Sequence, residues 1–201
     1  VGDHRLDPAY TRFDRRTLYL THDVTQLLKQ GNNAIGVLLG NGWYNHQSTA
    51  VWNFDQAPWR GRPKFCMDIR VVYDDGKVEF ISTGQDWKTS LSPVIFNSIY
   101  TAEHYDAPGF DDKKWKNASC TSAPSPLIVS QQMHPIRDVE MLRPAKMIKL
   151  SDSIYLFDLG RNIAGVSQLT IKGKPGTEVR LKHSERIGEN NRADMSNIDY
   201  H

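Results

Sequence analysis

Short apolar runs separated by turn residues make up most of the hydrophobic pattern of this chain. Apolar and polar positions alternate in residues 64–73, and the turn signal Asp74-Asp75-Gly76 follows. Residues 77–81 would form the second strand, so this segment predicts a β-hairpin. Residues 34–39 are apolar and too few for a helix, which predicts a buried strand. Further strands are predicted at residues 17–21, 94–100, 141–148, 153–159, 166–172 and 178–183, with a turn at Lys174-Pro175-Gly176.

The helical signals are few and short. Asp23 is placed to cap one turn that runs through Leu27 and Leu28 and ends at Gly31. A second helical turn is predicted at residues 111–115, again capped by Asp. Many short strands with little helix predict an all-β fold of β-sandwich type. Residues 119–126 are rich in Ser, Thr, Ala and Pro, so we expect two units with a boundary near residues 124–135.

Composition and charge argue against several classes of function. The chain carries 25 basic and 23 acidic residues without a block of like charge, so it lacks the electrostatic footprint of nucleic-acid binding. No run approaches the roughly 18 apolar residues of a membrane span, and none is expected. Cys66 and Cys120 fit no metal spacing. Cys66 lies in an alternating run and is expected to be buried, while a bridge between the two cysteines stays open.

The loop at residues 40–61 carries the candidate binding chemistry. It is long for a compact domain, and its aromatic content argues against disorder. Flat rings beside short polar groups suit a sugar, which needs an apolar wall and a few oriented hydrogen bonds. The alternative is that Trp43 and Tyr44 are core residues at a strand end, because large aromatic side chains are mostly buried. The candidate carbohydrate-binding residues are Asn41, Trp43, Tyr44, Asn45, His46, Trp52, Asp55 and Trp59.

The same loop contains the oxygen ligands that would suit a metal ion. Asn41, Asn45, Asn53 and Asp55 are of the type that Ca²⁺ prefers, although they follow no regular calcium-loop pattern. The histidines show no zinc spacing. We therefore expect no cofactor and no metal site, with calcium as the one metal that this loop would suit.

Neighbouring carboxylates are the candidates for a glycosidase acid and base, which stand roughly 6.5–9.5 Å apart in an inverting enzyme. Asp74-Asp75 is explained by a turn, and residues 111–112 by a helix cap. Glu103 and Asp106 lie among aromatic residues and are explained by loop anchoring, since carboxylates at strand ends accept backbone N–H groups. No catalytic residue is therefore predicted in this chain.

A succession of motifs across nearly the whole chain resembles bacterial α-L-rhamnosidases. In the first part these motifs are Arg5-Leu6-Asp7-Pro8, Asp23-Val24-Thr25, Gly31-Asn32-Asn33-Ala34-Ile35-Gly36-Val37, Leu39-Gly40-Asn41-Gly42-Trp43-Tyr44, Tyr105-Asp106-Ala107 and Trp115. In the second part they are Pro135-Ile136-Arg137, Phe157-Asp158-Leu159-Gly160-Arg161-Asn162-Ile163-Ala164-Gly165 and Leu181-Lys182-His183-Ser184-Glu185. The departures are Asn41, Arg161 and Ser184, where the family commonly has Asp, Gln and Ala.

The resemblance implies two jelly-roll, galactose-binding-like β-sandwiches. Residues 1–126 would form the N-terminal sandwich, similar to a carbohydrate-binding module, and residues 127–201 the first part of a second, incomplete one. The family hydrolyses terminal α-L-rhamnose from glycosides in a separate helical (α/α) barrel, so we expect a fragment that is a non-catalytic accessory region.

The partners that the resemblance implies are a rhamnose-containing glycan or glycoside and the downstream catalytic domain of the same chain. The alternative is a purely structural scaffold that orients the barrel. A periplasmic or extracellular location is expected from the family's substrates.

Overall fold

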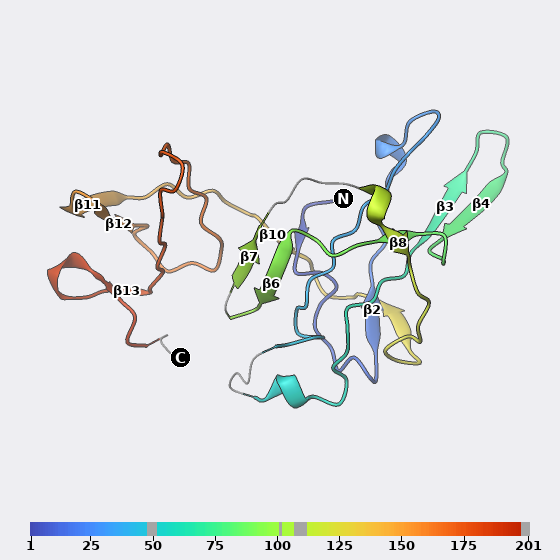
Figure 1. Ribbon diagram of the computed structural model, residues 1–201, viewed down its shortest axis with the longest axis horizontal. Coiled ribbons are helices and arrows are strands. Elements are labelled where there is room, and N and C mark those ends of the chain that lie inside the picture. The colour runs from blue at the N-terminus through green and yellow to red at the C-terminus, as the bar shows by residue number, and fades with distance from the viewer. Residues whose placement is uncertain (48–51, 101, 107–111, 198–201) are drawn as a thin grey trace. The chain divides into compact units, whose positions relative to one another are not determined.

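The computed structural model describes residues 1–47, 52–100, 102–106 and 112–197 (Figure 1). The chain forms two compact units, which are considered separately. The first comprises Val1–Gly2 and Leu6–Pro135, and the second comprises Asp3–Arg5 and Ile136–His201. The regular structure of the described residues consists of β-strands and short 3₁₀ turns, without an α-helix. The prediction of an all-β chain with little helix is confirmed.

Two hairpins of the first unit follow the local sequence pattern. Strands β3 (Asp68–Val72) and β4 (Val78–Ser82) pair antiparallel, and Gly76 takes the positive φ of 83° that their tight turn requires. Strands β6 (Val94–Ser98) and β7 (Ala102–Tyr105) form the second hairpin, with a register shift after Val94. Strands β3, β4 and β6 confirm predicted strands, whereas β7 was not predicted.

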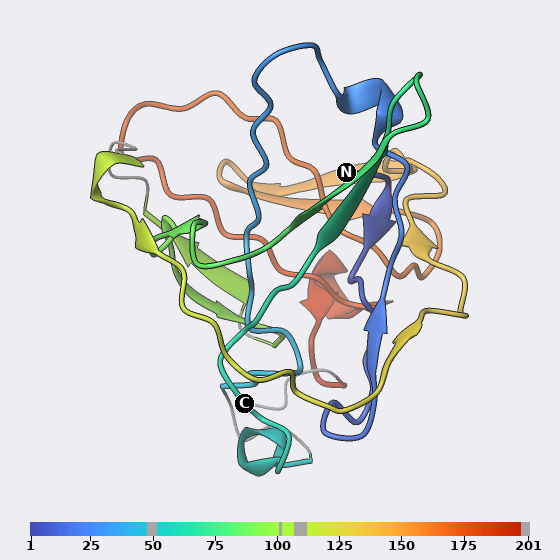
Figure 2. The ribbon, with the colours of Figure 1, turned by 90° about the vertical axis from the view of Figure 1, so that its right-hand side faces the viewer.

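The other strand pairs of the first unit join segments that are distant in sequence. Strand β2 (Thr17–Tyr19) pairs in parallel with β9 (Ile128–Ser130), and β5 (Lys88–Thr89) pairs antiparallel with β8 (Lys116–Asn117). Figure 2 shows β2 and the yellow strand β9 running side by side. The 3₁₀ turns are η1 (Thr25–Leu27), η2 (Phe54–Gln56) and η3 (Asp112–Lys114). Asp23 was predicted to cap the first of them; the N-cap residue is instead Val24, and the Asp23 side chain, one residue earlier, accepts the Thr25 backbone N–H at 2.9 Å.

The second unit contains one longer hairpin and several short elements. Strands β11 (Lys146–Ser151) and β12 (Ile154–Asp158) pair antiparallel, with a register shift between Lys149 and Ser151. Strands β13 (Arg186–Ile187) and β14 (Ala193–Asp194) flank η4 (Glu189–Asn191). The predicted turn at Lys174-Pro175-Gly176 is confirmed by the bond from the Thr177 N–H to the Lys174 carbonyl at 3.0 Å.

The second unit also includes a short segment near the start of the chain, Asp3–Arg5. Strand β1 (His4–Arg5) pairs antiparallel with β10 (Ile136–Arg137), so His4 stands opposite Arg137 and Arg5 opposite Ile136. Ion pairs flank this ladder: Arg5 donates to Asp138 at 2.6 Å, and Arg137 lies 3.1 Å from Asp3. All four side chains are largely exposed, so the ion pairs add little stability. The backbone hydrogen bonds therefore contribute most to the pairing of β1 with β10.

Three predicted strands and the predicted burial of Cys66 are wrong. Residues 34–39, 166–172 and 178–183 lie outside any strand ladder, and apolar side chains of the first segment are exposed. An apolar run favours an extended backbone, but a strand also needs a neighbour that satisfies its N–H and C=O groups. Cys66 and Cys120 are exposed free thiols.

Burial is low in the described part of the chain. Thr11, His46 and Ser125 are its buried residues, and no apolar side chain there is fully buried. Much apolar surface is therefore open for contact with other groups.

Candidate functional site

An aromatic cluster organises the predicted binding loop of the first unit. The Tyr10 ring lies at 6.0 Å from Phe54, nearly parallel to it, and at 6.1 and 6.4 Å from Trp43 and Trp59, edge to face. Trp43 also packs edge to face on Phe54 at 5.4 Å. Edge-to-face and offset pairs at these distances are the favourable arrangements of aromatic rings. Trp43 and Trp59 therefore each pack on Tyr10 and Phe54 within the cluster.

The start of the loop is anchored by asparagine hydrogen bonds. The Asn41 backbone N–H donates to the side chain of Asn97 on β6 at 2.8 Å, and the Asn41 amide donates to the Asn97 carbonyl at 3.0 Å. The Asn41 side-chain oxygen accepts from the Asn45 amide at 2.7 Å. Asn41 thus ties the loop to a strand, and its amide is already engaged within the protein.

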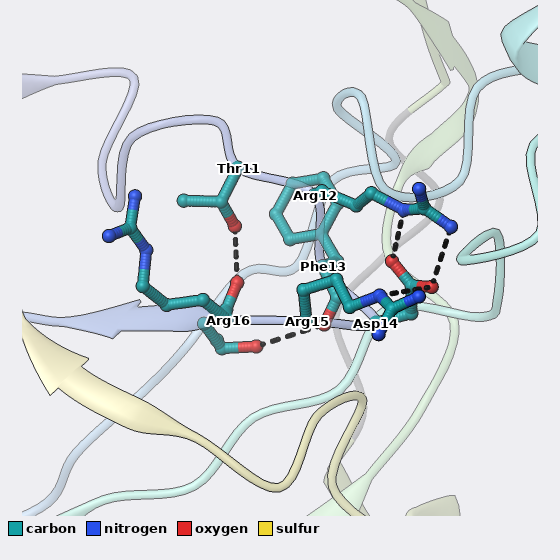
Figure 3. A network of polar contacts seen from close by, with 7 residues as sticks. Thr11, Arg12, Phe13, Asp14, Arg15 and Arg16 are labelled. Carbon is teal, nitrogen blue, oxygen red and sulfur yellow. Dashed lines mark hydrogen bonds and ion pairs between the residues drawn. The ribbon is translucent and has the colours of Figure 1, made fainter.

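A turn at residues 11–16 supports the cluster from another part of the chain (Figure 3). The buried Thr11 hydroxyl donates to the Arg16 carbonyl at 2.5 Å, which closes the turn. Arg12 donates to both carboxylate oxygens of Asp14, at 2.9 and 3.2 Å, and this hydrogen bonding lowers the pKa of Asp14 below its usual value. The Arg12 guanidinium also lies 6.0 Å from the centre of the Trp59 ring.

The exposed edge of the cluster combines a ring with polar atoms that lack partners. Trp52 is 64% exposed and its ring lies 5.6 Å from Phe54. The Asp55 Oδ1 and Trp59 Nε1 atoms are shielded from solvent, and neither has a hydrogen-bond partner. Such atoms are costly to bury unless a water or ligand group satisfies them. We call Trp52, Asp55 and Trp59 the edge site.

The eight predicted carbohydrate-binding residues thus divide into two groups. The residues of the first group are half-buried or buried, and their side chains pack or hydrogen-bond inside the unit; they are Asn41, Trp43, Tyr44, Asn45 and His46. The second group is the edge site, Trp52, Asp55 and Trp59. Sequence reasoning missed the supporting rings of Tyr10 and Phe13, which pack on this loop from another part of the chain. Their aromatic character was visible, but their proximity depends on tertiary structure.

Among the candidate carboxylates, Asp75 acts in a turn, whereas loop anchoring by the Glu103 and Asp106 side chains stays a prediction. The Asp75 side chain accepts the Lys77 N–H at 2.9 Å, which confirms the turn. Glu103 stands opposite Asn97 in the β6–β7 ladder, and the Asp106 N–H donates to the Pro93 carbonyl at 2.8 Å. Of the third pair, Asp111 lies outside the described residues.

Among the described residues, no group of three or more His, Cys, Asp or Glu side chains is arranged to hold a metal ion. No helix in that part of the chain is long and apolar enough to cross a membrane.

Comparison with known families agrees with the all-β architecture and the motif order. Residues 1–140 match the model of the alpha-L-rhamnosidase N-terminal domain, and residues 148–201 match the bacterial alpha-L-rhamnosidase concanavalin-like domain. The chain belongs to the bacterial α-L-rhamnosidase family. Similar curated proteins are α-L-rhamnosidases of Formosa agariphila, 32% identical over 96% of this chain and 21% of that protein, and of Streptomyces avermitilis, 32% identical over 92% and 19%.

Solved rhamnosidase structures share the fold. The S. avermitilis α-L-rhamnosidase complexed with L-rhamnose is similar with a TM-score of 0.82 at 29% identity, over 100% of this chain and 20% of that one. The enzyme from Dictyoglumus thermophilum is similar with a TM-score of 0.67 at 33% identity, over 81% and 18%. The chain therefore corresponds to the N-terminal β-sandwich region of α-L-rhamnosidases, as its motifs indicated, and spans about a fifth of the length of the curated relatives it matches.

Proposed function

We propose that this chain is a non-catalytic accessory region of an α-L-rhamnosidase and that its first unit binds rhamnose-containing glycans at the edge site. The observations that carry the proposal are the exposed ring of Trp52 and, within the same short segment of the chain, two polar atoms without hydrogen-bond partners, Asp55 Oδ1 and Trp59 Nε1. A carboxylate accepts a hydrogen bond and an indole N–H donates one. A sugar hydroxyl does both, so a polyhydroxylated ligand can satisfy the two atoms.

The exposed ring supplies the second part of the recognition. Trp52 rests on Phe54, which holds it in place, while most of its surface stays open. An apolar sugar face stacks on such a ring, and the methyl group of a 6-deoxy sugar adds apolar contact area. The relative from S. avermitilis was solved with L-rhamnose, which supports this choice of ligand.

Titration of the 1–201 chain with L-rhamnose, followed by tryptophan fluorescence, tests the proposal. We expect saturable binding that Asp55→Asn and Trp59→Phe each weaken about tenfold, since each removes one charged or directional hydrogen bond. Trp52→Ala should also weaken it. Tyr105→Ala is the matched control, because Tyr105 is similarly exposed at 66% but lies on β7.

One outcome would refute this function. Absence of saturable binding up to tens of millimolar, with Ca²⁺ and with a chelator, would rule out the glycan-binding role. The calcium arm is included because Asp55 and the neighbouring asparagines offer oxygen ligands.

A scaffold that orients a downstream catalytic barrel of the same protein is the second candidate. It is supported by the large exposed apolar surface and by the packed rings of Trp43 and its neighbours. If it is correct, substitutions of Trp52 and Trp59 lower the stability of the full-length enzyme and leave rhamnose affinity unchanged. We further propose export to the periplasm or the medium, where rhamnose-containing polysaccharides are accessible; cell fractionation tests this.

A further inference from the structure

An open groove lies in the second unit, apart from the edge site. It has a volume of about 340 Å³ and is lined by Ser153, Ile154, Tyr155, Glu178 and Arg180. This volume is at the lower end of the range for small-molecule sites, which suits a single sugar ring rather than a large cofactor. The lining combines a flat ring, a hydroxyl, a carboxylate and a guanidinium.

The hairpin extends this groove into an exposed aromatic face. Tyr155 stands opposite Lys149 and Phe157 opposite Met147, and residues two apart on a strand share a face. Tyr155 and Phe157 are 44% and 49% exposed. The two residues stand about 6.8 Å apart along the strand backbone, so one face of β12 presents two exposed aromatic side chains on which sugar rings can stack.

The charges around the groove compensate each other. Arg180 lies 2.6 Å from Glu178, and Lys149 lies 2.8 Å from Asp152. Each pair has no net charge, so neither attracts an anion or a cation. The charged groups of both pairs still have hydrogen-bond donors and acceptors that the ion pair does not use. The chemistry therefore favours a neutral polyhydroxylated ligand.

We propose that the groove at Tyr155, Glu178 and Arg180, together with the Phe157 ring, is a second glycan-binding site for neutral saccharides. It shares only the ligand class with the proposed function, because it lies in the other unit and uses different residues. A chain with two such sites would hold a polysaccharide at two points, which raises the apparent affinity when both sites engage one strand.

The two sites can be observed separately in the 1–201 chain. All five tryptophans, at positions 43, 52, 59, 87 and 115, lie in the first unit, so tryptophan fluorescence reports on that unit alone. The ¹³C-labelled methyl group of Met147, opposite Phe157, reports on the second. The probe is methyl α-L-rhamnoside, followed by both signals in one titration.

We expect a saturable shift of the Met147 signal. Tyr155→Ala should weaken this binding about tenfold. Tyr155→Phe keeps the aromatic ring, so it should bind the probe with unchanged affinity. Arg180→Ala should weaken it, whereas Arg161→Ala is the matched control, because Arg161 is also exposed and ion-paired, to Glu140.

Three results would overturn the second site. They are no shift of Met147 at saturating probe, an unchanged dissociation constant in Tyr155→Ala, or loss of the Met147 response in Asp55→Asn. A Met147 shift without a tryptophan response would support the second site and refute only the edge site.

Discussion

Replacement of Asn41 by alanine tests whether this residue anchors the loop. The substitution removes the hydrogen bond from the Asn41 amide to the Asn97 carbonyl at 3.0 Å and the bond accepted from Asn45 at 2.7 Å. It leaves the bond from the Asn41 backbone N–H to the Asn97 side chain at 2.8 Å. The variant therefore isolates the contribution of the Asn41 side chain.

The expected loss follows from those two bonds. Each contributes about 1 kcal/mol net in a partly buried position, so Asn41→Ala should lower the free energy of unfolding by about 2 kcal/mol. For a chain of this size, that corresponds to a fall in Tm of about 6 °C. Asn41→Asp, which introduces the residue common in the family, keeps the acceptor but loses the donor to Asn97. We expect an intermediate Tm.

Thermal unfolding followed by tryptophan fluorescence measures these changes, because every tryptophan lies in the first unit. Asn32→Ala is the control, since Asn32 is an exposed asparagine of the same unit. A fall of less than about 1 °C in Asn41→Ala would refute the anchoring role. The amide would then be free to bind a ligand, and rhamnose affinity should be re-measured in that variant.

Three further changes probe the same region. Trp43→Ala removes a ring that packs on several others and should cost about 2–4 kcal/mol of stability with little change in rhamnose affinity, measured by denaturant unfolding and titration. Gly61→Ala should lower the Tm, because a Cβ there would lie 2.8 Å from the Tyr44 hydroxyl. An unchanged Tm would show that the Tyr44 side chain moves aside at no cost in stability. Arg12→Gln should raise the pKa of Asp14, measured by NMR titration, because it removes the hydrogen bonds that lower this pKa. In the wild type, the lowered pKa stabilises the folded state at pH values above the pKa of Asp14 in the unfolded chain. This stabilisation is lost as the pH falls through the pKa of Asp14 in the folded state.

The local parts of the fold were predictable from sequence and the long-range parts were not. The β3–β4 hairpin follows from alternation and a glycine turn, both of which act over a few residues. The parallel pairing of β2 with β9 joins Thr17 to Ile128, and no local pattern reveals that neighbour. The segment at residues 34–39 shows the converse, since its apolar character predicted a partner strand that the structure does not provide.

The candidate site was predictable in its location and not in its roles. Ring content and loop length singled out residues 40–61, and the aromatic rings do assemble there. Whether a ring stacks on a sugar or on another ring depends on which segments fold against it, and Tyr10 arrives from outside the loop. The unpartnered atoms of Asp55 and Trp59 emerge only when every neighbour is placed.

The pairing of β1 with β10 makes most of the first unit an enlarged hairpin loop. Arg5 and Ile136 are opposite one another in an antiparallel ladder, so the chain leaves and re-enters the second unit at points about 5 Å apart. Residues 6–135 can then be removed or exchanged as a cassette, with a short turn in their place, without cutting the strands they connect. The sequence of the cassette can therefore diverge while the framework that holds its two ends stays the same.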